Sequence, residues 1–335
     1  MIYKYSVIIT AYEDSYYLRE CIDELLNLNY LKFEIILISE VFLDFDLCLK
    51  KHKNFTVLRC KNIKSPAKKR NIASKKAQGD ILAFLDDDSY PKKNWLKIAD
   101  KFFLNNSEKT TCIGGPGILP KNESFFGKIC NLYFISRTFY PFSERYIERK
   151  EKNLLEFSDW PSVNFFIRKS FFLKIRGFDE RYWPGEDSKL CEEVLKRKGK
   201  IIYISNLIVF HYRRSSLSKY IKQIYRYGFH RGLFFFNGDN NSKKIIFALP
   251  FICSLFLILF FLINYQNINY ILFLVFIYLI FLISDLLYLI KYEKNIIILL
   301  FSRLLTLITP FIYGFGFAIS ILISKMYKHE STLKR

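Results

Sequence analysis

The chain has 335 residues and a formal net charge of +20, and 51% of its residues are hydrophobic. This length exceeds what one ordinary hydrophobic core organises, so more than one domain is expected. The seven cysteines are scattered, odd in number and never spaced as C-x-x-C. This pattern argues against a disulfide framework or a zinc site and favours reduced thiols in a cytosolic domain.

Charge is distributed unevenly along the chain. Residues 1–244 hold 44 of the 51 Lys and Arg and 28 of the 31 Asp and Glu, which places +16 of the net charge there. Such a basic domain suits nucleic acid, an anionic membrane surface or a nucleoside diphosphate. The apolar segments that follow favour the membrane surface. The sequence contains no RNA- or DNA-binding motif, so no nucleic-acid partner is expected.

The first hundred residues alternate strand and helix patterns. Short apolar or β-rich runs predict strands at 6–10, 33–39, 55–58 and 81–85. Helical spacing from Leu18 to Leu26, and a helix beginning at Ser65-Pro66, lie between them. This order predicts an α/β domain with a mostly parallel central sheet covered by helices. Ligands of such sheets bind beyond the carboxyl ends of the strands.

The segment 124–140 is unusually aromatic. It suits a helix that lies either against the membrane or against the core, and we favour the core. The segment 216–231 has Leu217, Tyr220 and Ile224 on one helical face, with Lys219 elsewhere. An ordinary surface helix would show the same pattern, but its place beside the apolar segments favours an interfacial amphipathic helix that leads into the bilayer.

Three apolar segments follow, at 245–263, 270–290 and 296–324. The first two have about the 20 residues needed to span a bilayer, and the lysines that flank them put both outer ends inside. The third contains Arg303 and Pro310. As a simple span it would put the basic tail outside, whereas a re-entrant or broken hairpin would return the tail to the cytosol. Two to four membrane-embedded segments are therefore expected.

These patterns together predict three regions. They are a catalytic α/β domain over 1–214, an amphipathic interfacial helix with a linker over 215–244, and a helical membrane domain with a basic tail over 245–335.

The strongest chemical signal is the run Asp86-Asp87-Asp88 at the end of a buried strand. Adjacent carboxylates repel each other, so a fold that gathers them at a strand end usually holds a cation there. Hard oxygen ligands suit Mg²⁺ or Mn²⁺, which also bind diphosphate oxygens. The alternative is a solvated acidic loop. His211, which ends a later predicted strand, is a candidate third ligand.

A second acidic block is Gly177-Phe178-Asp179-Glu180 followed by Gly185-Glu186-Asp187. A carboxylate at a helix start behind a glycine is able to accept a proton from an acceptor hydroxyl. The alternative is helix capping, since acidic residues are favoured in first turns. A third pattern, Gln223-x-x-Arg226-Tyr227, offers an amide and a cation for a diphosphate or acceptor near the membrane, or is simply a solvated face.

Together these motifs resemble the family-2 glycosyltransferases of the GT-A fold over about residues 3–232. The resemblance is carried by the opening run 6–12, by the stretches 67–73 and 79–88, and by the acidic block at 177–191. It implies transfer of a sugar from a nucleotide sugar (UDP, GDP or dTDP) with Mg²⁺ or Mn²⁺. It also implies a catalytic domain that faces the cytoplasm, most simply at a bacterial inner membrane.

The resemblance also implies residue roles. The residues implied in donor binding are Ala11, Tyr12, Glu13, Glu40, Arg70 and Asp86, and those implied in metal binding are Asp86, Asp88 and His211. Asp187 would be the catalytic base, with Glu186 beside it. The residues implied in binding the acceptor or the diphosphate are Trp183, Gln223, Arg226 and Tyr227. One departure concerns recognition of the nucleotide base of the donor. The family commonly has an Asp pair after its second strand, where this chain has Ser39-Glu40. The donor is therefore left open.

Four functions remain open at this stage. The acidic pair favours a hydroxyl acceptor on a lipid-linked sugar or a surface polysaccharide, because a polyprenyl phosphate is already ionised and needs no strong base. Polyprenyl-phosphate glycosylation and processive polysaccharide synthesis are alternatives. An inactive, transferase-like membrane scaffold or transport subunit is another, against which the intact Asp86, Asp88 and Asp187 argue.

Overall fold

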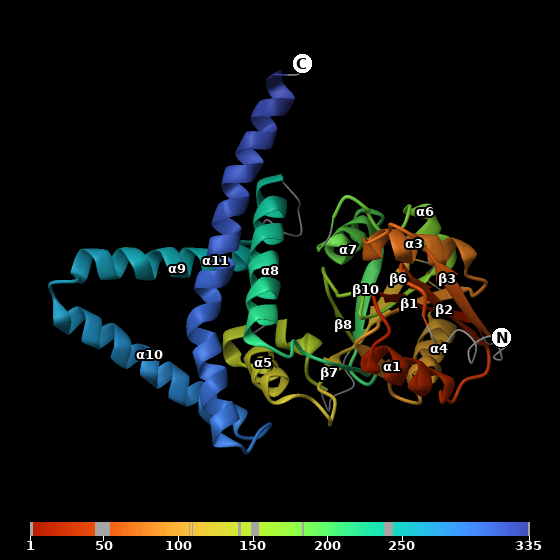
Figure 1. The fold of residues 1–335 in the computed structure, drawn as a ribbon, viewed down its shortest axis with the longest axis horizontal. Helices are drawn as coiled ribbons and strands as arrows, with labels where there is room; N and C mark the ends of the chain where they lie inside the picture. The colour runs from red at the N-terminus through yellow and green to blue at the C-terminus, as the bar shows by residue number, and fades with distance from the viewer. Residues whose placement is uncertain are drawn as a thin grey trace. The chain divides into compact units, whose positions relative to one another are not determined.

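A computed structural model describes residues 3–43, 54–106, 108, 110–139, 142–148, 154–182, 184–237 and 244–333 (Figure 1). The chain forms two compact units. One comprises Met1–Pro120 with Glu144–Tyr212, and the other comprises Lys121–Ser143 with Arg213–Arg335.

The first unit is built on a central sheet that has eight strands among the described residues. Their order is β3-β2-β1-β4-β9-β6-β10-β8. The strands are β1 (Tyr5–Ala11), β2 (Phe33–Ser39), β3 (Phe55–Arg59), β4 (Ile81–Asp86), β6 (Thr111–Gly114), β8 (Leu154–Glu156), β9 (Asn164–Arg168) and β10 (Lys200–Ile204). β1 to β4 are parallel, as predicted. β9 runs antiparallel to both of its neighbours, β4 and β6.

Helices cover both faces of this sheet. They are α1 (Tyr16–Leu26), α3 (Pro66–Lys76), α4 (Trp95–Asn105), α6 (Lys169–Lys174) and α7 (Glu186–Lys196). Alternate residues of β1 point to opposite faces, so Val7 packs with α1 and α4 while Ile8 packs with α3, α6 and α7. Ser65 caps α3 by accepting a hydrogen bond from the amide of Lys68, and Pro66 follows at the first helical position.

A second, small sheet begins just after the end of β4. It contains β5 (Ser89–Pro91), β11 (Val209–His211) and β7 (Gly117–Ile118), with β11 in the middle. β5 begins directly after the acidic run, and its Ser89 pairs with His211 of β11. The small sheet thereby brings a residue more than a hundred positions away beside Asp88.

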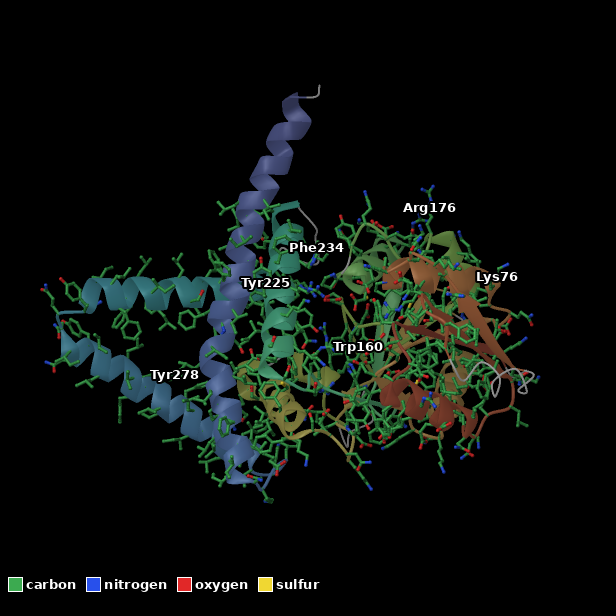
Figure 2. All side chains as sticks on the ribbon, in the orientation of Figure 1. Lys76, Trp160, Arg176, Tyr225, Phe234 and Tyr278 are labelled. Atoms are coloured by element: carbon green, nitrogen blue, oxygen red, sulfur yellow. The ribbon has the colours of Figure 1, made fainter. Side chains whose placement is uncertain are left out.

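The second unit is helical. It comprises α5 (Phe125–Ile135), the short 3₁₀ turn η1 (Arg137–Phe139), α8 (Leu217–Asn237), α9 (Ile245–Asn264), α10 (Ile268–Leu289) and α11 (Ile296–Leu333). Three stretches among the described residues are long and apolar enough to cross a membrane: α9, α10 and Ile296–Ile323 of α11. Figure 2 shows side chains standing out along α9 and α10, including Tyr278 of α10.

The structure bears on two interpretations of this region. The segment 124–140 does not join the core of the α/β domain, because α5 packs against α11, and its Tyr133 ring contacts Tyr220 of α8 edge-on. The aromatic side chains of α5 thus cover apolar helices rather than the sheet. The third apolar segment is one continuous helix through Pro310, not a broken hairpin.

Candidate active site

The acidic run lies at the carboxyl edge of the parallel strands, where sheet ligands are expected. Asp86 is the last residue of β4 and pairs in register with Thr10 of β1. The backbone N–H of Tyr12 donates to the carboxylate of Asp87. The ends of β1 and β4 are therefore joined at the position where the sequence predicts the donor site and the metal site.

The three predicted metal ligands come together. One ligand atom from each of Asp86, Asp88 and His211 lies within 4.8 Å of the others, and all three residues are half-buried. His211 Nε2 is 3.2 Å from Asp88 Oδ1. Two carboxylates and one imidazole are a donor set that fits a divalent cation.

Arg70 joins this group to the second acidic block. Its Nη2 donates to Asp86 Oδ1 at 2.6 Å and its Nη1 to Glu186 Oε1 at 3.0 Å. The arginine is only 4% exposed. Glu186 begins α7 behind Gly185, whose φ of 115° favours glycine. Burial, and then the charge of Asp187, raise the pKa of Glu186 despite Arg70.

Asp187 is half-buried in the first turn of α7. Its Oδ2 accepts from the amide of Ser162 at 3.4 Å, and its Oδ1 accepts from the amide of Ser188 at 3.2 Å. Burial raises the pKa of Asp187, Asp159 raises it further, and Arg70 opposes both. A carboxylate with a raised pKa is a better proton acceptor than an exposed one, which suits a general base.

The predicted nucleotide residues lie along the same edge. Ala11 ends β1 opposite Ser39 of β2, so Tyr12 and Glu40 leave adjacent strands together. Beneath them lies Lys69 of α3, which is fully buried. Its Nζ donates to the carbonyl of Ala11 at 2.9 Å and stands 4.2 Å from the centre of the Tyr12 ring. Glu13 is exposed beside them.

Sequence reasoning missed Lys69, Asn71 and Asp159. Asn71 Nδ2 donates to the carbonyl of Phe178, and the amide of Phe178 donates back to Asn71 Oδ1 at 2.9 Å. This pair of bonds holds the second acidic block against α3. A signal existed, because the α3 sequence has no apolar stripe and its buried face includes Lys69, Arg70 and Asn71. A helix that buries charged side chains needs partners for them.

The structure does not test the four predicted acceptor-side residues. Gln223, Arg226 and Tyr227 lie on α8 of the second unit, where Gln223 Nε2 donates to the Tyr227 hydroxyl at 3.0 Å. Their part in the site stays a prediction. Trp183 lies outside the described residues.

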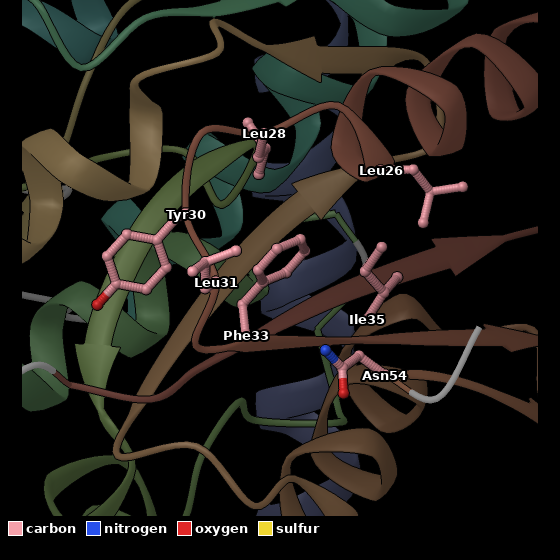
Figure 3. A pocket seen from close by; sticks show the side chains of 7 residues that line it. All are labelled: Leu26, Leu28, Tyr30, Leu31, Phe33, Ile35 and Asn54. Carbon is pink, nitrogen blue, oxygen red and sulfur yellow. The ribbon is translucent and has the colours of Figure 1, made fainter.

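A hollow of about 250 Å³ lies far from this chemistry (Figure 3). Its lining is mainly apolar and includes Leu26, Leu28 and Phe33. Phe33 is the first residue of β2, whereas the acidic groups gather at the other ends of the strands. We assign no substrate to it.

Residues 4–229 match the family model described as "Glycosyltransferase like family 2". The chain belongs to this family. A TarS protein of Staphylococcus aureus, a poly(ribitol-phosphate) β-N-acetylglucosaminyltransferase, is 31% identical over 122 residues, which are 34% of this chain and 21% of that protein. The chain thus spans about a fifth of that relative's length.

A second glycosyltransferase is matched over much more of its length. It is the dolichyl N-acetyl-α-D-glucosaminyl phosphate 3-β-D-2,3-diacetamido-2,3-dideoxy-β-D-glucuronosyltransferase of Methanococcus voltae. It is 24% identical over 264 residues, which cover 73% of this chain and 77% of that protein.

Solved structures confirm the GT-A fold. GalNAc-T7 with UDP, GalNAc and Mn²⁺ superposes with a TM-score of 0.52 at 16% identity, covering 69% of this chain and 51% of that one. The mannosyltransferase PcManGT of Pyrobaculum calidifontis, with GDP-Man and Mn²⁺, gives 0.50 at 13% identity, covering 69% and 63%.

Proposed function

We propose that the chain is an inverting glycosyltransferase that moves a sugar from a nucleotide sugar to a hydroxyl group. The observation that carries the proposal is the Arg70 bridge between Asp86 and Glu186. It ties the candidate cation group to the residue beside Asp187. One buried guanidinium thereby connects the group that would stabilise the leaving diphosphate with the acidic pair that would remove the acceptor's proton.

The donor half is assigned to the strand ends. Asp86, Asp88 and His211 would hold Mg²⁺ or Mn²⁺, and a bound cation would offset the negative charge that grows on the departing diphosphate. Tyr12 and Glu40 would contact the nucleoside, with Lys69 supporting the Tyr12 ring from below. The donors to be considered are UDP-, GDP- and dTDP-sugars.

The acceptor half is assigned to Asp187. The acceptor oxygen attacks the anomeric carbon while its proton passes to the Asp187 carboxylate. The bond from that carbon to the diphosphate oxygen breaks on the opposite face, so the configuration inverts. Asp187 suits this task because it is half-buried, is held in place by the amides of Ser162 and Ser188, and has a raised pKa.

A hydroxyl acceptor is favoured over a polyprenyl phosphate, because the phosphate oxygen is ionised without help and would leave Asp187 idle. The name of the Methanococcus voltae relative describes transfer to a sugar that is already linked to a lipid phosphate. The name of the Staphylococcus aureus relative describes transfer to a poly(ribitol phosphate). We therefore propose a lipid-linked sugar or a surface polysaccharide as acceptor, at the cytoplasmic face of a bacterial inner membrane.

The test is donor turnover by the purified full chain in detergent. Release of nucleoside diphosphate from UDP-, GDP- and dTDP-sugars is measured with Mn²⁺, with and without a chelator. Asp187→Asn should retain donor binding and lower transfer by about 10²–10⁴-fold. Near-normal transfer by this variant would remove Asp187 from the role of base. If no donor showed metal-dependent turnover, the alternative of an inactive, transferase-like membrane scaffold would be favoured.

A further inference from the structure

α8 and α11 run side by side in the same direction. The Tyr220 hydroxyl lies 2.7 Å from Thr309 Oγ1, and three turns later Gly232 lies against Ser320. Small residues permit this approach, since an added Cβ would meet the opposite helix at Gly228, Gly232 and Gly316. α8 is therefore fixed beside the middle and later part of the apolar stretch Ile296–Ile323.

The exposed side of α8 carries three cations among apolar side chains. Lys219, Lys222 and Arg226 are exposed, whereas Tyr220 and Ile224 are buried. If α11 crossed a bilayer along its axis, these charges would lie level with the centre of its apolar stretch. Charged side chains at that depth are costly and rare. The packing of α8 therefore argues against α11 as a span.

The exposure of α11 is one-sided. Its exposed large apolar side chains fall within one side of the helix, and most recur at helical spacing: Ile296, Ile297, Leu300, Phe301, Leu304, Leu307, Phe311, Phe315 and Leu322. Its buried face carries hydroxyls, among them Ser302, Thr306 and Thr309. A single apolar stripe on a helix backed by polar structure is the pattern of a helix that lies along a bilayer surface.

α9 and α10 show the opposite pattern. In their most apolar stretches, only 17% of the α9 residues and 6% of the α10 residues are buried, so their side chains are exposed nearly all round. A helix that is apolar on every side belongs inside hydrocarbon. Figure 1 shows α9 and α10 leading away from α11 and meeting at a tip, where Tyr265, Gln266 and Asn267 carry no charge.

The base of this hairpin has interfacial chemistry. The ammonium of Lys291 lies 4.1 Å from the ring centre of Tyr288 and 4.7 Å from that of Tyr292. Nearby, the amide of Arg137 donates to Asp285, which also pairs with Arg303 of α11. Tyrosines and basic residues mark the membrane–water boundary on the cytoplasmic side.

We propose that only the α9–α10 hairpin crosses the bilayer and that α11 lies in the membrane surface. The apolar stripe of α11 would face the lipid, with α8 stacked on its water side. The chain would then cross twice and return its basic tail to the side of the first unit, which satisfies the positive-inside trend. This arrangement concerns the lipid surface alone and stands whether or not the enzyme proposal does.

Depth measurements test it on the full chain in lipid vesicles, with Cys48 and Cys253 replaced by Ser. Single cysteines carrying nitroxides are placed on α11 at Ile297, Phe311 and Leu322. Matched controls are placed on α9 at Ile245, Phe256 and Ile263. All six native side chains are exposed. The α11 labels should share one shallow depth, while on α9 the Phe256 label should lie deep between two shallow ones. A Phe311 label as deep as that at Phe256 would overturn the proposal.

Sidedness gives an independent check. In sealed vesicles, an impermeant maleimide should label Ser331→Cys from the same side as Lys61→Cys of the first unit. Gln266→Cys at the hairpin tip should react only from the other side. Labelling of Ser331→Cys from the Gln266 side would mean that α11 spans, and labelling of all three from one side would mean that the hairpin does not cross.

Discussion

Arg70 donates to Asp86 at 2.6 Å and to Glu186 at 3.0 Å, and so connects two acidic motifs that lie a hundred residues apart. The guanidinium is planar and always charged, which lets one side chain satisfy two carboxylates at once. Glu186 is 6% exposed, so its charge depends on this partner.

Arg70→Met should destabilise the first unit by about 3–5 kcal/mol, because breaking a buried pair leaves an uncompensated buried charge. The loss should come mainly from Glu186, since the Asp86 side chain is 31% exposed. Thermal denaturation in detergent measures it. The loss should shrink as the pH falls, because the pKa of Glu186 is already raised by burial and the protonated acid is easier to bury.

The double variant Arg70→Met, Glu186→Gln supplies the control. A neutral amide needs no cation, so the double variant should be more stable than Arg70→Met alone at neutral pH. If the second change added a further loss instead, Glu186 would owe its stability to other contacts and the bridge would be incidental.

Cation binding should depend on Asp88 and His211 far more than on Asp87. Asp88→Asn and His211→Ala each remove one member of the group that converges within 4.8 Å. Loss of a direct ligand should weaken Mn²⁺ binding by more than the roughly 10–100-fold typical of supporting residues. Calorimetric titration of the purified chain with Mn²⁺ alone measures this affinity.

Asp87→Asn is the matched control, because it makes the same change from carboxylate to amide at the neighbouring position. Asp87 lies outside the converging group and accepts from the backbone of Tyr12 instead. Its replacement should weaken Mn²⁺ binding much less. An equal loss in Asp87→Asn would show that the cation is held by a different set of oxygens.

The fold could be predicted further than the site. Continuous apolar runs mark strands buried on both faces, so β1, β2 and β4 were predicted from local pattern alone. The antiparallel place of β9 between β4 and β6 depends on long-range pairing that no local pattern encodes. α5 was misplaced for a related reason, since aromatic residues suit an α/β core and a membrane unit equally well.

Within the site, motifs identified the residues whose chemistry is unusual at their position. Asp86, Asp88 and His211 were grouped correctly because each ends or follows a strand, and such ends converge. Arg70 was expected to bind the donor, but no spacing rule says that it bridges two carboxylates. Asp159 could not be predicted in this way, because it belongs to none of the motifs found in the sequence.

Asp159 helps to set the pKa of Asp187. The pKa of Asp187 is raised first by burial and next by the charge of Asp159, whose Oδ1 accepts from Ser188 Oγ at 3.1 Å. A base acts only when deprotonated, so kcat/KM should fall as the pH drops through this raised pKa. Asp159→Asn removes the second cause and should lower the pKa of Asp187. The acid limb of the pH–rate profile should therefore move to lower pH.

The control for this shift is Glu193→Gln. It likewise replaces a carboxylate by an amide, but at a half-buried residue of α7 that does not contribute to the raised pKa of Asp187. Its acid limb should coincide with that of the unmodified chain, measured at saturating Mn²⁺. An acid limb that stays in place in Asp159→Asn, or moves to higher pH, would contradict Asp187 as the base that sets it.

Gly228 tests the packing on which the membrane arrangement depends. An added Cβ there would collide with the backbone of Tyr313, and backbone atoms cannot move aside as a flexible side chain can. Gly228→Leu should separate α8 from α11 and lower stability by about 1–3 kcal/mol, as overpacking does. Ser218→Leu adds a similar side chain at an exposed position of the same helix and should leave the melting temperature nearly unchanged. If both variants melted alike, the α8–α11 contact would contribute little to the stability of the second unit, and the cations of α8 would no longer constrain where α11 lies.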